Sequence, residues 1–155
     1  MNELSATGFA YVAGLFDGEG YIRFSYKRKD RPKEKVGQFH TEFYVTVTNK
    51  NKPVLLYLKE VFGGSIFASW VEKNHVYFWK LTRGPAFPFL RHIRPYLKIK
   101  REQADLVLKN QRLISNFAAG RRGRTPEEKE RLTALDRKIR AYTKRGGTRL
   151  GDIGK

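Results

Sequence analysis

Two acidic residues, Asp17 and Glu19, lie close together where the sequence changes from a helical to a strand pattern. A carboxylate near a helix C-terminus is disfavoured by the helix dipole, so its position calls for a functional reason. Glu19 lies between Gly18 and Gly20, where carbonyl groups freed at the helix end can act as neutral oxygen ligands. Carboxylate, carbonyl and water oxygens suit Mg²⁺, which often bridges to phosphate. The alternative is a surface ion pair with lysine or arginine, and the spacing alone leaves both interpretations open.

The sequence lacks the patterns of several other kinds of catalytic site. It contains no GxxxxGK[ST] and no HExxH segment, and its histidines are scattered at positions 40, 75 and 92. Gly18 and Gly20 begin a GxG pattern, but a helix precedes it rather than follows it, which argues against a dinucleotide loop. Without cysteine there are no disulfides and no thiolate metal ligands. Histidine-based zinc or triad chemistry is not expected, nor is an organic cofactor.

The segment before Glu19 predicts a helix over residues 7–18, with apolar residues such as Val12 and Phe16 at helical spacing. Small residues recur at every fourth position, which forms one stripe along the helix. They are Ala6, Ala10, Gly14 and Gly18. Glycine inside a helix costs about 1 kcal/mol relative to alanine. Close packing of a second helix against the stripe would compensate, because small side chains let two backbones approach.

The remaining sequence predicts an α+β domain. Alternating polar and apolar residues predict strands at 21–27, 38–48, 65–71 and 76–82. Helices are expected at 53–62, 86–94, 101–117 and 125–142. The order αββαββα, with extra C-terminal helices, favours one four-stranded antiparallel sheet. The expected organisation is a principal domain at 1–118, a basic linker and C-terminal helix of the same domain at 119–145, and a disordered tail at 146–155.

Charge indicates the class of partner. Lysine and arginine number 32 against 15 acidic residues, which gives a formal net charge of +17 and a pI near 10.3. Such an excess is typical of proteins that bind a polyanion, and it favours nucleic acid. The alternatives are solubilising lysines or a ribosomal-type protein without chemistry. No apolar run is long enough for a membrane span, and the N-terminus lacks a secretory pattern. The expected location is the cytoplasm, or the nucleoid or organelle stroma for an organellar gene.

Three segments resemble one known family. Residues 12–20, VAGLFDGEG, resemble the LAGLIDADG motif, with valine in its first position and glutamate for its second aspartate. Residues 97–106 are similar to the family's stretch after the sheet, and residues 47–50 to the polar end of its second strand. The three lie in the family's order, and the resemblance covers residues 7–110. The chain is therefore identified as a LAGLIDADG homing endonuclease of the single-motif, homodimeric type.

The resemblance implies a fold and an activity. A saddle-shaped sheet, with helices on one face, lies over the major groove of double-stranded DNA. Two motif helices pack along their small residues, and each brings its acid to a two-fold axis. That acid is Glu19, which binds Mg²⁺ or another divalent cation such as Mn²⁺ together with the Gly18 carbonyl. The expected interface residues are Ala10, Ala13, Gly14 and Asp17. A single motif copy implies a homodimer and a long, near-palindromic site cut to leave 3′ overhangs.

The resemblance also assigns supporting residues. Asn49 matches the polar residue that organises active-site water, and Lys100 matches the lysine near the scissile phosphate. Lys52 is the candidate for a third basic residue. The short chain without splicing motifs favours an intron-encoded product. The runner-up is a non-cleaving protein of the same fold, either an RNA splicing maturase or a DNA-binding regulator.

The polar sides of the first two predicted strands are the expected DNA contacts. They are Tyr21, Arg23, Ser25, Lys27, His40, Glu42, Tyr44 and Thr46. Arg23 is suited to guanine, and Glu42 can accept a hydrogen bond from cytosine N4. The alternative for each is a solvated strand face. Phosphate contacts are expected from basic residues in the loops. These are Lys33, Lys35, Arg121, Arg122 and Arg124.

Overall fold

A computed structural model describes residues 3–29, 38–71, 74–116 and 123–146 of the chain. Helix α1 (Ala6–Glu19) leads directly into strand β1 (Gly20–Lys29), and β2 (Gln38–Asn49) follows. Helix α2 (Lys52–Phe62) then precedes the strands β3 (Ser65–Val71) and β4 (Asn74–Thr82). The remaining elements are helical: α3 (Ala86–Ile93), η1 (Arg94–Tyr96), α4 (Arg101–Lys109), α5 (Gln111–Ser115) and α7 (Pro126–Gly146). The predicted order αββαββα with further C-terminal helices is confirmed.

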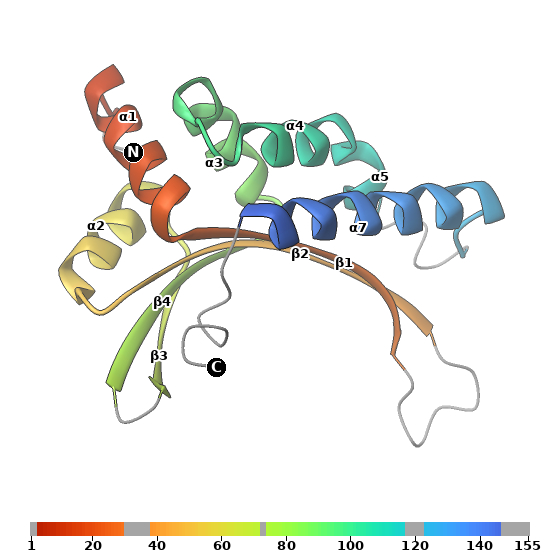
Figure 1. The fold of residues 1–155 in the computed structure, drawn as a ribbon, viewed down its shortest axis with the longest axis horizontal. Helices are drawn as coiled ribbons and strands as arrows, with labels where there is room; N and C mark the ends of the chain where they lie inside the picture. Colours follow the sequence, from red (N-terminus) through yellow and green to blue (C-terminus); the bar gives the residue numbers. More distant parts are fainter. Residues whose placement is uncertain (1–2, 30–37, 72–73, 117–122, 147–155) are drawn as a thin grey trace.

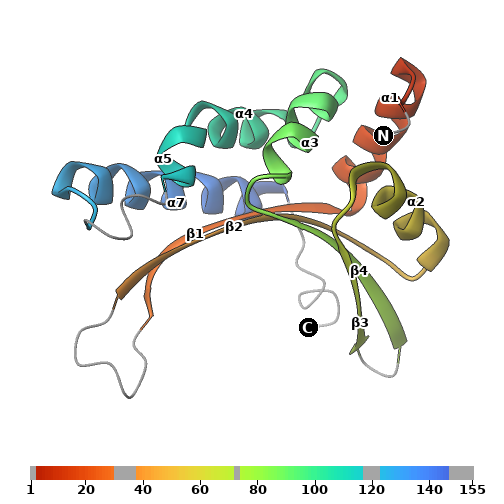
Figure 2. The same ribbon diagram turned by 180° about the vertical axis from the view of Figure 1, so that it is seen from behind.

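The four strands form one antiparallel sheet in the order β1-β2-β4-β3. The sheet curves like an arch, and the described helices all lie above its convex side (Figures 1 and 2). Below it, the concave face is left uncovered by any described helix or strand. Strand register fixes the side of each residue, because Gly20 pairs with Val47 and Tyr44 pairs with both Arg23 and Thr82. The fold is therefore the predicted saddle.

The core lies between the convex side of the sheet and the helices. Trp79, on β4, is fully buried, and its ring contacts Phe89 of α3 edge-on, with centroids 5.2 Å apart. Phe16 of α1 meets the same Phe89 ring at 5.4 Å. Burial of such aromatic residues contributes much of the hydrophobic stabilisation of a small domain. The core thus holds α1 at a fixed place on the sheet.

Two glycines are required by geometry. A Cβ on Gly20 would lie 2.3 Å from the Phe16 ring, so only glycine permits the direct passage from α1 to β1. Gly64 has φ of +89°, and a Cβ there would lie 2.6 Å from the Lys80 carbonyl oxygen. The Gly63 carbonyl beside it accepts a hydrogen bond of 2.8 Å from the Trp79 indole. These contacts set the ends of α1 and α2.

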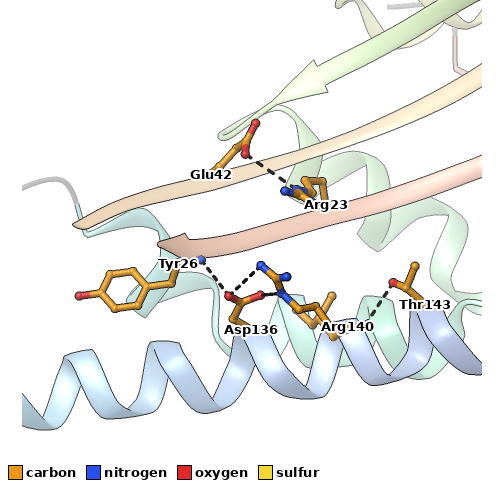
Figure 3. Close-up of polar contacts among 7 residues, drawn as sticks. Arg23, Tyr26, Glu42, Asp136, Arg140 and Thr143 are labelled. Carbon is orange, nitrogen blue, oxygen red and sulfur yellow. Dashed lines mark hydrogen bonds and ion pairs between the residues drawn. The ribbon is translucent and has the colours of Figure 1, made fainter. Parts of the chain in front are cut away.

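The C-terminal helix α7 packs against β1. Leu132, Leu135 and Ile139 join the hydrophobic core. Its buried Asp136 accepts a hydrogen bond of 3.4 Å from the Tyr26 backbone N–H and pairs with Arg140 one turn later, at 2.6 Å (Figure 3). The helix runs four residues beyond the predicted end at 142, and residues 147–155, with most of the predicted tail, lie outside the described residues.

Two other predicted helices also differ from the structure. The N-cap of α1 is Ser5, whose hydroxyl accepts from the Gly8 N–H at 3.2 Å, so the helix begins at Ala6 rather than residue 7. The single helix predicted over 101–117 is divided at Asn110, whose side-chain amide donates to the Leu106 carbonyl. Asparagine competes locally for backbone hydrogen bonds, which explains the interruption. No helix in the described ranges is long and apolar enough to cross a membrane.

Candidate functional site

Glu19 is the last residue of α1 and is exposed to solvent. Gly18 before it is also exposed, and a Cβ there would have no atom within 4 Å. The helix ends because the chain turns extended at Gly20, whose N–H still bonds to the Phe16 carbonyl. The last carbonyl groups of a helix have no partner further along the same helix. The Glu19 carboxylate and the Gly18 carbonyl therefore lie at an exposed helix end.

The neighbouring acid, Asp17, is used within the chain. Its carboxylate accepts backbone N–H bonds from Lys98 at 2.7 Å, Ile99 at 3.2 Å and Lys100 at 3.0 Å. Charge-assisted bonds of this kind are about twice as strong as neutral ones. Asp17 thus fastens the segment before α4 to the end of α1. Its predicted place at a dimer interface stays a prediction beside this local role.

Lys100 is brought beside Glu19 by that attachment. Its ammonium group donates to the Asp17 backbone carbonyl oxygen, and its side chain is half-buried. Burial lowers the pKa of Lys100, while the nearby carboxylates of Asp17 and Glu19 act in the opposite direction and favour the charged form. The structure therefore brings together Glu19 and Lys100, which the family resemblance had paired.

Asn49 lies at the same end of the sheet. It follows Val47, the partner of Gly20, by two residues, and its side-chain oxygen accepts from the Asn51 N–H at 2.8 Å. Lys52 begins α2, and its ammonium group lies 5.5 Å from the centroid of the Tyr77 ring. Tyr77 pairs with Asn49 across the sheet. Tyr77 is therefore a neighbour of both Lys52 and Asn49.

One side of α1 is open. The stripe of Ala6, Ala10, Gly14 and Gly18 is exposed, and a Cβ on Gly14 would have no atom within 4 Å. The large side chain of Tyr11, on the same helix, is 55% exposed, and its ring contacts Tyr57 of α2 edge-on. Ala13, which was also predicted at the interface, is instead completely buried within its own chain. The helix accordingly has one side in its own core and one small-residue side free.

The donor atoms at the end of α1 fit a hard divalent cation but belong to an incomplete set. No group of three or more histidine, cysteine or acidic side chains gathers in the described part of the chain. Glu19 contributes one carboxylate, and the Gly18 carbonyl contributes a neutral oxygen, both of which suit Mg²⁺ or Mn²⁺. The small-residue side of α1 ends at these donors. A second chain packed there would bring a second Glu19.

The concave face carries the polar residues predicted from β1 and β2. Arg23 and Glu42 form an ion pair with 3.8 Å between Nε and Oε2 (Figure 3). The pKa of Arg23 is raised: partial burial lowers it, but the interactions with Tyr21 and Glu42 outweigh that effect. The prediction for Ser25 is wrong, because it is only 3% exposed. Its short side chain follows the longer Arg23 and lies opposite Glu42.

Several predicted contacts fall elsewhere. Lys27 and His40 occupy strand positions, but their side chains lie outside the described set. Four other basic residues lie outside the described ranges: Lys33, Lys35, Arg121 and Arg122. Arg124 was expected at phosphate, yet its guanidinium donates within the chain, to the Leu113 carbonyl at 2.9 Å and to the Thr41 hydroxyl at 3.4 Å. It ties the start of α7 to α5 and β2.

Sequence reasoning missed the other half of the concave face. Lys80 of β4 lies over the Tyr44 ring, 3.7 Å from its centroid, which places both on the concave side. Strand alternation and register put further residues there. They include Ser65, Phe67, Ser69, Val76, Phe78 and Thr82. The alternating pattern of the fourth predicted strand could have identified them, if the polar surface assigned to the first two strands had been extended to all four.

Comparison with known proteins now decides the family. Residues 12–98 match the model of the family described as LAGLIDADG endonuclease, which is more than half of the chain. The chain belongs to the LAGLIDADG endonuclease family. The matched region runs from α1 to the segment held by Asp17. No curated protein sequence matches the chain.

Solved structures share the LAGLIDADG fold. The homing endonuclease I-CvuI in complex with its target superposes with a TM-score of 0.67 and 22% identity, over 87% of this chain and 81% of that one. The archaeal intron-encoded homing endonuclease I-Vdi141I, complexed with DNA, gives 0.68 and 19%, over 86% and 82%. The meganuclease I-SmaMI, bound to uncleaveable DNA, gives 0.64 and 18%, over 84% of this chain but 44% of that one. These likenesses confirm the fold.

Proposed function

We propose that the chain is a divalent-metal-dependent endonuclease that hydrolyses phosphodiester bonds of double-stranded DNA at a long, near-palindromic site. It acts as a homodimer and leaves 3′ overhangs. The observation that carries the proposal is the exposed Glu19 at the end of the open α1, with Lys100 held beside it through Asp17. An acid and a lysine so placed suit hydrolysis of a phosphate ester.

The homodimer is supported by α1. Its exposed stripe allows the same helix of a second chain to approach closely, and the exposed Tyr11 of the same helix supplies apolar area. An interface between identical surfaces has two-fold symmetry, so two Glu19 side chains meet near the axis. These 155 residues hold one copy of the motif, so in the proposed dimer the second acid comes from the second copy of the chain.

Each residue of the proposed site has a different role in the reaction. Glu19 and the Gly18 carbonyl would hold the cation, which when bound supplies Lewis-acid stabilisation of the phosphate oxygens. Lys100 places a positive charge where negative charge develops on the phosphate, and Asp17 keeps its backbone in position. Asn49 lies at the same end of the sheet and orients water through its amide. Lys52 adds charge at the start of α2.

The concave face is the proposed DNA surface. Its curvature suits a duplex, and a two-stranded β-ribbon fits the major groove. The net charge of +17 supplies affinity for phosphate that does not depend on sequence. The solved structures of I-CvuI and I-Vdi141I are complexes with a target or with DNA, which supports DNA binding by this chain. Within it, Arg23 is the proposed guanine contact.

The test is Glu19→Gln. This change removes the charge and keeps the size, so cleavage of a selected DNA site in Mg²⁺ should be abolished while DNA binding stays within about threefold. Glu60→Gln, an exposed acid on α2, is the control and should cut normally. Cutting by Glu19→Gln at the normal rate would refute the mechanism. Sequence-specific binding without cleavage by the unmodified protein would instead favour a regulator of the same fold.

A further inference from the structure

The concave face has two halves of different chemistry. Over β1 and β2 it carries Tyr21, Arg23, Glu42 and Tyr44, which are linked by charge and hydrogen bonding. Over β4 and β3 it carries the apolar side chains Val76, Phe78 and Phe67. Lys80, above the Tyr44 ring, stands at the border between the halves. The proposed DNA surface therefore changes from charged to apolar across the sheet.

Phe67 is the most exposed of the apolar group. It lies opposite Phe78 on the neighbouring strand and is 53% exposed, while Val76 and Phe78 are half-buried. The adjacent concave positions, Ser65 and Ser69, have short side chains, so nothing large flanks the ring on β3. A phenylalanine left open on a strand face keeps apolar surface in water, which is unfavourable unless a partner covers it.

The partner that fits is the same duplex. The apolar group is continuous with the polar residues of the concave face, because Thr48 of β2 pairs with Phe78 and Thr46 pairs with Lys80. In the major groove, the one apolar group on a base edge is the thymine 5-methyl, and phenylalanine is among the side chains that contact it. A protein partner would have to enter a concavity lined on its other half by Arg23, with Lys80 at the border.

We infer that the β3–β4 half of the concave face reads thymine methyl groups through Phe67, with Phe78 beside it, so that the target carries thymine under this half of each chain. This inference rests on the proposed function, since it names what the DNA surface selects. It assigns guanine recognition to the charged half around Arg23 and methyl recognition to the apolar half.

The experiment first selects bound duplexes from a randomised library with the unmodified full-length protein. Each thymine of the selected site is then replaced singly by deoxyuracil, which removes only the methyl group. At the positions under Phe67, binding should weaken about fourfold for each methyl removed. Phe67→Ala should abolish that penalty, because protein and DNA changes that affect one contact are not additive.

Trp70→Ala is the matched control. Trp70 is an exposed aromatic of the same strand, 73% exposed, and it stacks on His75 on the opposite side of the sheet. It should leave every deoxyuracil penalty unchanged. A selected site without thymine, or penalties that persist in Phe67→Ala, would overturn the inference while leaving the nuclease proposal intact. Failure to enrich any duplex would overturn both.

Discussion

Helices α1 and α7 lie above the same side of one sheet (Figure 1), yet they differ in how much of their surface is packed within the chain. Helix α7 buries Leu132, Leu135 and Ile139, and its polar Asp136 is satisfied within the chain. Helix α1 buries Val12 and Phe16 but leaves its small-residue side open. Packing within one chain is enough for α7. The open side of α1 is the part of the fold suited to a second chain.

The two helices also differ in the role of an aspartate, Asp136 in α7 and Asp17 in α1. Asp136 is buried and accepts one backbone N–H from β1 while pairing with Arg140. Asp17 is half-buried and accepts three, all from the segment before α4. The bond to Asp136 attaches α7 to the sheet, whereas the three bonds to Asp17 place Lys100 beside Glu19. One aspartate therefore serves mainly stability, and the other serves both stability and the site.

The largest expected effect comes from closing the open side of α1 with Gly14→Leu. The folded chain has room for this side chain, so its stability should be retained. In a symmetric dimer the leucine of each chain enters the interface, and each costs about 1 to 3 kcal/mol of dimerisation free energy. The two together lower the dimerisation constant at least about 30-fold. Sedimentation velocity and a cleavage assay would measure both losses.

Gly84→Leu is the control for that change, because a side chain at Gly84 also meets no atom within 4 Å but belongs to the turn between β4 and α3 rather than to α1. It should keep the mass and the activity. A Gly14→Leu protein that remains a fully active dimer would show that α1 is not the interface.

Removing the carboxylate of α7 has the next largest effect. Asp136→Ala should lower the free energy of unfolding by about 2 to 3 kcal/mol, since it leaves the Tyr26 N–H and the Arg140 guanidinium without their acceptor. Urea denaturation followed by circular dichroism measures it. Asp136→Asn keeps one acceptor oxygen and should lose less. A change below about 0.5 kcal/mol would mean that α7 is held by apolar packing alone.

The contrast also explains what the sequence could predict. Alternation located all four strands, and the small-residue stripe marked the open side of α1, because both patterns are local. The burial of Ala13 and Ser25 was missed because exposure depends on neighbours from distant segments. The roles of Asp17 and Arg124 depend on backbone groups that have no sequence pattern, so only the folded chain shows them.

Asp17→Ala should have a smaller effect on stability than Asp136→Ala and a larger one on activity. Losing three partly exposed N–H bonds costs about 1 to 2 kcal/mol of unfolding free energy. Because the Lys100 backbone is then released, kcat should fall more than the affinity for DNA. Thermal unfolding and single-turnover cleavage separate the two. Equal losses in binding and turnover would argue against the positioning of Lys100.

The exposed pair of Asp105 with Arg94 on α4 and η1 gives the smallest effect and a baseline for both aspartates. The hydrogen bond and charge of Arg94 lower the pKa of Asp105 below its ordinary value of 3.8. A depressed carboxyl pKa contributes stability above the ordinary value and loses it as the pH falls through the folded one. The melting-temperature difference between wild type and Asp105→Asn should therefore be small at pH 7 and shrink below about pH 4. A melting-temperature difference that grows as the pH falls would contradict the lowered pKa of Asp105.

The most direct test of the two-chain site is the mass of the protein that cuts. Light scattering at high salt, on the preparation used for cleavage, should give twice the 18.0 kDa of one chain. The cleavage rate should fall on dilution as that species dissociates. A stable species of 18.0 kDa that cuts both strands at an undiminished rate would contradict an active centre built from two copies of Glu19.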